Sequence, residues 1–110
     1  STRVVPSYVV VSSAKAALES HVRQLAMELA RTGKGITANC IRAGVTDTPA
    51  LRKIPEAAAM IEITLRRNPT GRMTTPQDVA NAIVALSAEG TEFINGDIIS
   101  VDGGEFITGS

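Results

Sequence analysis

Tyr8 and Lys15 are the two residues of this chain whose types and spacing most suggest chemistry. Tyr8 is the only tyrosine, and Lys15 follows it with six residues between. Seven positions make nearly two turns of an α-helix, so both side chains would lie on one face, about 10 Å apart along the axis. A phenol and an ammonium so placed could hold one ligand, and the cation would favour the phenolate. Alone, the same spacing also fits ordinary boundary residues of a helix.

The first half of the chain predicts one long helix and one strand. Apolar residues recur at helical spacing from Ser13 to Arg31, and Gly33 is suited to a left-handed helix end. The β-branched run 9–11 should delay the regular helix to Ser12 or Ser13. Residues 36–41 then predict a short, mostly apolar strand.

The second half predicts a helical insert, a helix and a second strand. After a loop over 42–49, two weak helical pieces follow as far as Arg67, interrupted at Pro55, and a turn comes at 68–71. Thr75-Pro76 with Asp78 is a helix start with a capping box, and the helix should reach about Ala88. Residues 97–101 predict the second strand, which Asp102-Gly103-Gly104 ends, with Asp102 serving the turn.

Composition narrows the classes of protein. The 110 residues include 11 basic and 11 acidic side chains, and this balance argues against nucleic acid or a membrane surface as partner. The apolar runs are all shorter than the roughly 20 residues that span a bilayer. A single cysteine, Cys40, favours a reducing, cytoplasmic setting. His, Cys, Asp and Glu do not cluster at metal-ligand spacing, so we expect no metal site.

The order helix, strand, helical insert, helix, strand predicts an α/β fold with parallel strands. Two parallel strands cannot cover their own edges, so we expect the C-terminal half of a Rossmann-like doubly wound sheet. Residues 1–110 would then be the C-terminal part of a single dinucleotide-binding domain, whose first half would precede Ser1. Because the chain has no Gly-rich nucleotide loop, we expect it to be inactive in isolation.

Five motifs, in order, resemble those of the short-chain dehydrogenases/reductases. Pro6-Ser7-Tyr8, six residues, and Lys15-Ala16-Ala17-Leu18-Glu19 resemble the active-site helix of that family. Most members place three residues between Tyr and Lys, whereas the enoyl-acyl-carrier-protein reductases place six, as here. The other four motifs are residues 36–41, 43–48, 68–73 and 96–104, which resemble the following strand, the nicotinamide-side loop, the turn before the last helix, and the terminal strand with its Gly pair.

The resemblance implies a dinucleotide-binding reductase that uses NADH or NADPH to reduce the C=C bond of an enoyl thioester in fatty acid synthesis. Tyr8 would donate a hydrogen bond or proton to the enolate oxygen, and Lys15 would hold the nicotinamide ribose. The cofactor-binding residues implied are Lys15, Ala43, Gly44, Val45, Thr46 and Thr48. Two of them depart from the family pattern, since Val45 replaces a common Pro and Thr46 replaces a common Ile.

The insert between Ala50 and Arg67 would correspond to the mobile lid over the substrate. Its apolar residues Leu51, Ile54 and Met60 are the candidate substrate contacts. Its basic residues, which are Arg52, Lys53, Arg66 and Arg67, are candidate contacts for an acyl carrier protein or for coenzyme A phosphates.

The long helix should also serve assembly. Its Leu stripe would pack on the sheet, leaving the small residues Ala16, Ala17, Ala26 and Ala30 for close approach by a second helix. Because family members commonly pair this helix across a two-fold axis, we expect a homo-oligomer, most simply a homotetramer.

Two alternatives remain open at the level of sequence. One is a short-chain reductase or dehydrogenase acting on a carbonyl or alcohol, like a 3-oxoacyl reductase. The Tyr-to-Lys spacing argues against it, and a serine beside Tyr8 from the preceding half would argue for it. The other is a non-catalytic fragment that serves only in packing.

Overall fold

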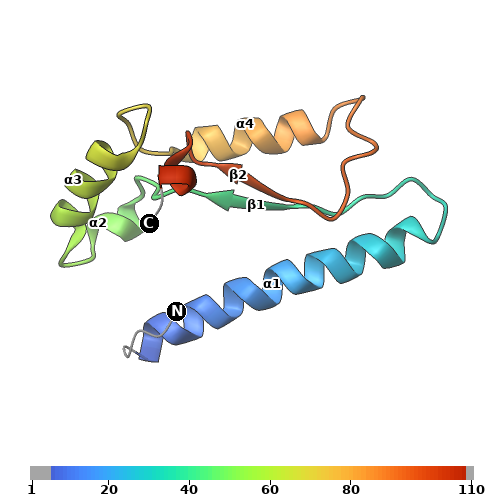
Figure 1. Cartoon of the computed structure of the whole chain (residues 1–110), viewed down its shortest axis with the longest axis horizontal. Coiled ribbons are helices and arrows are strands. Elements are labelled where there is room, and N and C mark those ends of the chain that lie inside the picture. The colour runs from blue at the N-terminus through green and yellow to red at the C-terminus, as the bar shows by residue number, and fades with distance from the viewer. Residues whose placement is uncertain (1–5, 109–110) are drawn as a thin grey trace. The chain divides into compact units, whose positions relative to one another are not determined.

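The computed structural model describes the backbone of residues 6–108 and the side chains of residues 16–108. Figure 1 shows the order of the elements along the chain. They are α1 (Pro6–Ala30), β1 (Cys40–Ala43), α2 (Pro49–Arg52), α3 (Ala57–Arg67), α4 (Pro76–Leu86), β2 (Ile98–Val101) and the 3-10 helix η1 (Glu105–Thr108). The chain divides into two compact units. The first contains the residues up to Cys40 together with Glu92–Ile98, and the second contains Ile41–Thr91 together with the segment from Ile99.

Helix α1 begins at Pro6, seven residues before the predicted start at Ser13. The prediction gave too much weight to the three valines at 9–11. β-Branched residues cost only a few tenths of a kcal/mol each in a helix, and proline is favoured at a first helical position. The whole interval from Tyr8 to Lys15 is therefore helical.

The end of α1 agrees with the sequence, but its packing does not. Gly33 has φ 71°, and its N–H donates to Ala30 O, so the predicted left-handed end is confirmed. Leu18 and Leu25 of the expected buried stripe are about half exposed, whereas Ala26 is 2% exposed. The Asn95 side-chain amide donates to the Ala26 carbonyl oxygen at 3.2 Å. In this unit it is a small residue, not the leucines, that packs closely, against the turn at Asn95.

Residues 36–39, predicted as strand, precede β1 and are not strand. Their neighbour is the Asn95-Gly96 turn, where Gly96 has φ 74°. Side chains therefore make several of the bonds here: Ala38 N donates to Asn95 Oδ1 at 3.0 Å, and Asp97 N donates to Asn39 Oδ1 at 3.1 Å. The regular ladder starts only at Cys40.

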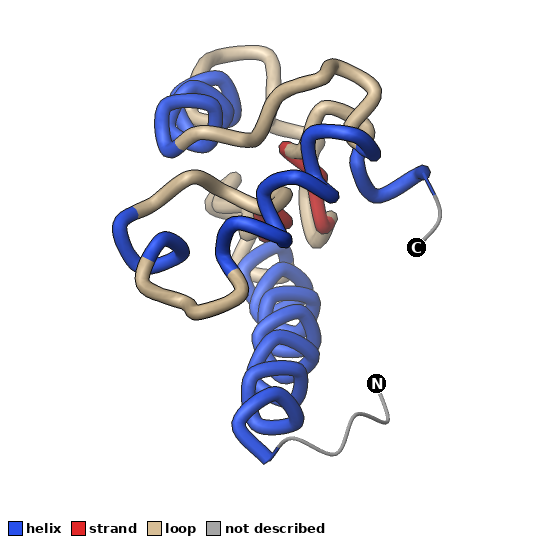
Figure 2. The backbone as a smooth tube through the Cα atoms, turned by 90° about the vertical axis from the view of Figure 1, so that its left-hand side faces the viewer, coloured by secondary structure: helices blue, strands red, loops and turns tan. Residues whose placement is uncertain are grey.

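Strands β1 and β2 pair in a two-stranded sheet. The pairing is parallel, because Cys40 N donates to Asp97 O, and Gly44 N, four residues further along the first strand, donates to Val101 O, four residues further along the second. The α/β class and the parallel strands are therefore confirmed. Both strands are short, as Figure 2 shows in red, and helices and loops make up most of the chain between them.

The second unit contains the helical insert that the sequence predicted. Its two pieces are α2 and α3, with the break around Pro55, and α3 contacts both α2 and η1. The turn at 68–71 is confirmed, since Gly71 N donates to Asn68 O at 2.9 Å and Gly71 has φ 75°. The buried residues of this unit are Leu51, Ala57, Thr64, Asn68, Met73, Thr74 and Asp102.

Helix α4 starts with the capping box that the sequence predicted. Thr75 Oγ1 accepts from Asp78 N at 3.1 Å, and Asp78 Oδ2 accepts from Thr75 N at 2.8 Å. Arg72 also forms an ion pair with Asp78 at 2.7 Å. The Arg72 hydrogen bond, followed by those of Thr75, holds the pKa of Asp78 well below its usual range. The stability that this carboxylate contributes is thus present above its usual pKa and is lost as pH falls toward the lowered value.

Among the helices of the described part, none combines the length and apolar character needed to cross a bilayer.

Replacing Thr75 by alanine should lower the free energy of unfolding of the full-length protein by about 1 kcal/mol, because the N-cap oxygen is lost. Thr75→Ser keeps that oxygen and should stay close to the wild type. Urea denaturation of the three proteins measures the difference. Equal losses in the alanine and serine variants would mean that the threonine methyl group, not the cap, supplies the stability.

Candidate functional site

Two polar segments follow the carboxyl ends of the parallel strands. The loop 44–48 leaves β1, and Asp102-Gly103-Gly104 leaves β2. In open α/β sheets, ligands bind in the crevice outside the carboxyl ends of the strands. The loop that the sequence assigned to the nicotinamide therefore lies at the edge where this fold class binds nucleotides.

Gly44 is the tightest point of that loop. A methyl group placed on it would lie 2.7 Å from Thr74 Oγ1, 2.9 Å from Asp102 Cβ and 3.1 Å from Glu105 Oε1. These distances are shorter than ordinary van der Waals contacts. Glycine is therefore required here by space, which allows the loop backbone to lie directly against the two neighbouring segments.

The hydroxyl groups of Thr46 and Thr48 have local partners. Thr46 Oγ1 donates to Gly44 O at 2.7 Å, and Thr46 forms an isolated parallel bridge with Thr74. Thr48 is the N-cap of α2, where Oγ1 accepts from Leu51 N at 3.1 Å. Both threonines thus shape the loop, and their contacts with a cofactor stay predictions.

A pocket of about 240 Å³ opens beside the loop, and we call it the loop pocket. Arg42 stands at one wall, its guanidinium 3.7 Å from the centre of the Phe106 ring and hydrogen-bonded to Ser100 Oγ at 2.8 Å. The residues that line the pocket are Arg42, Ala43, Gly44, Val45, Thr64, Arg67, Asp102, Glu105 and Phe106. Three predicted cofactor residues, Ala43 to Val45, therefore share one cavity.

Buried polar side chains hold the turn at Asp102, which is one of the residues that line this pocket. Asn68, which is 4% exposed, donates from Nδ2 to Asp102 O at 2.8 Å. Its Oδ1 accepts from the Thr70 hydroxyl group at 2.6 Å and from Thr70 N at 2.9 Å. The Asp102 carboxylate accepts from Gly104 N and Phe106 N, so the predicted turn role of Asp102 is confirmed.

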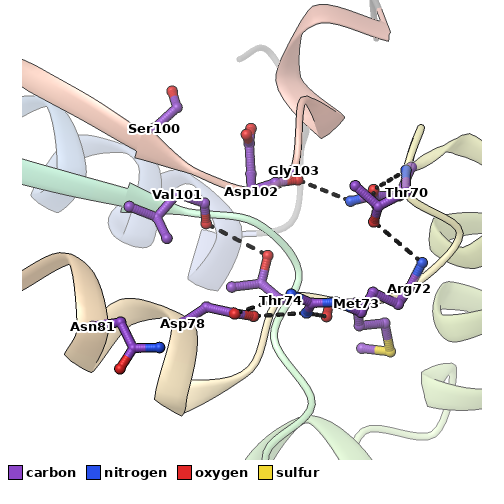
Figure 3. Close-up of a pocket in the computed structure, with 11 residues that line it drawn as sticks. Thr70, Arg72, Met73, Thr74, Asp78, Asn81, Ser100, Val101, Asp102 and Gly103 are labelled. Atoms are coloured by element: carbon purple, nitrogen blue, oxygen red, sulfur yellow. Dashed lines mark hydrogen bonds and ion pairs between the residues drawn. The ribbon is translucent and has the colours of Figure 1, made fainter.

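A second pocket, of about 260 Å³, shares Asp102 with the loop pocket, and we call it the turn pocket. Figure 3 shows Arg72 paired with Asp78 and Thr74 reaching toward the Val101 carbonyl oxygen. Its polar groups are thus largely paired with one another. It contains none of the predicted site residues, and we assign the candidate site to the loop pocket.

Sequence reasoning did not identify Arg42, Glu105 or Phe106 as lining residues of the site. Arg42 precedes the loop motif, and Glu105 and Phe106 follow the Gly pair, so all three lie outside the motifs. The signal available was the turn itself, because two successive glycines at 103–104 allow the chain to double back on the loop.

Tyr8 and Lys15 both lie in α1, but their side chains are outside the described residues. What the structure adds is the continuous helix between them, which places their backbone positions on one side of α1. Their contacts with a ligand stay predictions.

The predicted substrate residues do not line the loop pocket. Leu51 is 8% exposed in α2, Ile54 is exposed between α2 and α3, and Met60 is half-buried in α3. A substrate contact for each of them stays a prediction.

One of the four basic residues expected to meet an acidic partner is already paired. Arg52 Nε and Nη2 each donate to the Asp47 carboxylate at 2.8 Å. The Arg52 guanidinium holds the pKa of Asp47 below its usual range. The pair joins the loop to α2, so Arg52 has a structural role. Arg67, by contrast, lines the loop pocket.

In the described part of the chain, no three His, Cys, Asp or Glu residues come together in a way that could hold a metal ion.

Comparison with known proteins identifies the family. A family model described as Enoyl-(Acyl carrier protein) reductase matches residues 1–105, and the chain belongs to this family. The resemblance drawn from the motifs is thereby confirmed.

Relatives with different named activities match this chain at similar identity. A FabI enoyl-[acyl-carrier-protein] reductase [NADH] of Aquifex aeolicus is 40% identical over 107 residues, covering 97% of this chain and 39% of the relative. The subunit BbsD of a (2S)-[(R)-hydroxy(phenyl)methyl]succinyl-CoA dehydrogenase of Thauera aromatica is 39% identical over 93 residues, covering 84% of this chain and 36% of the relative. The chain thus spans less than half the length of these relatives.

The crystal structure of the NADH-dependent enoyl reductase from Aquifex aeolicus VF5 superposes with a TM-score of 0.81. Sequence identity is 38%, and the match covers 99% of this chain and 41% of that one. The predicted Rossmann-like class is therefore confirmed at the level of the fold.

Gly44→Ala should destabilise the full-length protein by about 1–3 kcal/mol, because the added methyl group overpacks the loop. Cofactor affinity should fall with it. Adding Thr74→Ala removes the neighbour at 2.7 Å but leaves Asp102 Cβ at 2.9 Å, so the double variant should recover only part of the loss. Urea denaturation and cofactor titration measure the two effects. Wild-type stability in Gly44→Ala would show that the loop has room to move away.

Proposed function

We propose that residues 1–110 form the C-terminal part of an oxidoreductase that uses NADH or NADPH to reduce the C=C bond of an enoyl thioester. The observation that carries the proposal is the unbroken helix α1, which holds Tyr8 and Lys15 with six residues between them. This is the spacing that characterises the enoyl reductase type. The first half of the domain would supply the nucleotide loop that this chain lacks.

In this proposal the nicotinamide end of the cofactor binds beside the loop from Ala43 to Val45, which lines the loop pocket. Gly44 has no side chain, and the space that a methyl group would take is filled by Thr74, Asp102 and Glu105, so these residues hold the loop backbone closely where Ala43 to Val45 line the pocket. The cofactor, when bound, supplies the hydride for the β-carbon of the substrate. The protein's part is to hold the loop and the ribose in place.

Tyr8 and Lys15 have different roles in this proposal. Negative charge develops on the thioester oxygen as the double bond is reduced, and the phenol of Tyr8 donates a hydrogen bond or proton to it. The ammonium group of Lys15 donates to the ribose hydroxyl groups and favours the phenolate form of Tyr8 electrostatically. Both residues come from the same helix, so their backbone spacing is set by α1.

The partners follow from the same assignment. We propose an acyl thioester as substrate, with acyl carrier protein as a candidate carrier, and Lys53, Arg66 and Arg67 as the basic residues left for it once Arg52 is paired with Asp47. We also propose a homo-oligomer, most simply a tetramer, and a cytoplasmic location. Ala26 is buried within its own unit, so the small residues available on α1 for a second helix are Ala16, Ala17 and Ala30.

A second candidate function is oxidation or reduction at a carbonyl or alcohol. The Thauera aromatica dehydrogenase subunit supports it, since its identity to this chain is nearly that of the enoyl reductase. The enoyl reductase match, however, extends over 107 residues against 93, and the Tyr-to-Lys spacing also favours the first candidate.

Substrate choice separates the two candidates. The full-length protein should oxidise NADH or NADPH with crotonyl-CoA much faster than with acetoacetyl-CoA, because the first offers a conjugated double bond and the second a ketone. Nicotinamide absorbance follows both reactions, with a sample lacking thioester as control. Faster reduction of acetoacetyl-CoA would instead establish the carbonyl reductase.

Tyr8→Phe should lower the turnover of crotonyl-CoA on the order of 100-fold, the loss typical of one oxyanion donor. Cofactor affinity should stay near the wild-type value, because the phenol acts on the substrate. Lys15→Ala is the matched comparison and should mainly weaken cofactor binding. Steady-state kinetics and fluorescence titration of the reduced cofactor separate the two effects. Undiminished turnover in Tyr8→Phe would remove Tyr8 from the mechanism.

A further inference from the structure

Glu105 stands at the point where the chain turns back from β2 onto the loop. Gly103 and Gly104 have φ 63° and 90°, in the left-handed region that favours glycine. Glu105 N then donates to Asp102 O at 3.1 Å, and η1 begins. The two glycines thus direct the first side chain of η1 toward a segment that precedes it by 60 residues.

The Glu105 carboxylate reaches the loop backbone directly. Oε2 accepts a hydrogen bond from Val45 N at 3.1 Å, and Oε1 lies 3.4 Å from Asn68 Nδ2, which donates to it. Oε1 would also lie 3.1 Å from a methyl group on Gly44. One carboxylate therefore binds Val45 and fills part of the space that a side chain at position 44 would need.

The backbone around Glu105 is itself held in place by hydrogen bonds. Asp102 is buried, and its carboxylate accepts from Gly104 N at 3.0 Å and from Phe106 N at 2.9 Å. Asn68 donates to the Asp102 carbonyl oxygen at 2.8 Å. The residues on both sides of Glu105 are therefore anchored, which limits the positions its carboxylate can take.

We infer that Glu105 is a positioning residue for the cofactor: by accepting from Val45 N–H, it sets the loop backbone from Gly44 to Thr46 in the conformation that receives the nicotinamide. The inference rests on the proposed function, since it needs the loop pocket to hold that ring. The loop is held on one side by the bond from Gly44 N to Val101 O and on the other by the bridge between Thr46 and Thr74, and the Glu105 oxygen adds a fixed point between them at Val45. Glu105 touches the loop and not the reacting atoms.

Two substitutions separate positioning from simple loss of structure. Glu105→Ala removes the acceptor, whereas Glu105→Gln removes the charge but keeps an oxygen that can accept from Val45 N–H. Glu89→Ala, an exposed glutamate in the loop after α4, is the control for removing a negative charge. The readouts in the full-length protein are the dissociation constant of the reduced cofactor by fluorescence titration, KM and kcat with crotonyl-CoA, and the thermal midpoint.

Glu105→Ala should weaken cofactor binding roughly tenfold, the effect of losing one hydrogen bond. KM for the cofactor should rise in parallel, with kcat at saturating cofactor changed much less. Glu105→Gln should recover most of the affinity, and Glu89→Ala should equal the wild type. This combination supports the inference.

Wild-type cofactor affinity in Glu105→Ala would overturn it. So would equal losses in Glu105→Ala and Glu105→Gln, because the acceptor oxygen would then be irrelevant. The titration needs no substrate, so it tests the inference even if crotonyl-CoA is not reduced. A protein whose cofactor affinity depends on Glu105 but which reduces only acetoacetyl-CoA would disprove the proposed reaction alone. A protein that reduces crotonyl-CoA but binds the cofactor equally well with and without the Glu105 carboxylate would disprove this inference alone.

Discussion

The parallel pairing of β1 with β2 is the constraint from which the candidate site follows. Parallel strands cannot be joined by a hairpin, so the chain must return through α2, α3 and α4 before β2 can form. That return brings the two strand ends to one edge. The loop after Ala43 and the turn at Asp102 are thereby neighbours, although they are far apart in the sequence.

Once these segments meet, the polar groups between them need partners. Asn68 bonds both the turn at Asp102 and its own turn at Thr70, while Glu105 closes onto the loop at Val45. Throughout the side chains described, every buried nitrogen or oxygen has a hydrogen-bond partner. A satisfied buried network of this kind is rigid, because each member that moves leaves another unpaired. The turn at Asp102 and the loop at Val45, which both line the loop pocket, are therefore held in place.

The residues proposed to act on the substrate and cofactor and the residues that shape the cofactor loop come from different parts of the chain. Tyr8 and Lys15, the residues proposed for proton and ribose contacts, belong to one long helix. The loop at Gly44 is shaped by segments that follow it in sequence, above all Asp102 and Glu105. Membership of the family explains why the fold is shared with its relatives. The proposal that the substrate is a double bond and not a carbonyl depends on the six residues between Tyr8 and Lys15.

The sequence by itself determined the features that depend on near neighbours. The capping box at Thr75, the left-handed end at Gly33 and the alternation of helices with two strands were all predictable, because each depends on residues a few positions apart. It misplaced the start of α1 and the first strand, where weak local preferences were overruled. Only the tertiary structure decided that Ala26 would be buried and that Glu105 would hold Val45. Both contacts join residues about 60 or more positions apart, and no local pattern encodes which distant backbone group a side chain will meet.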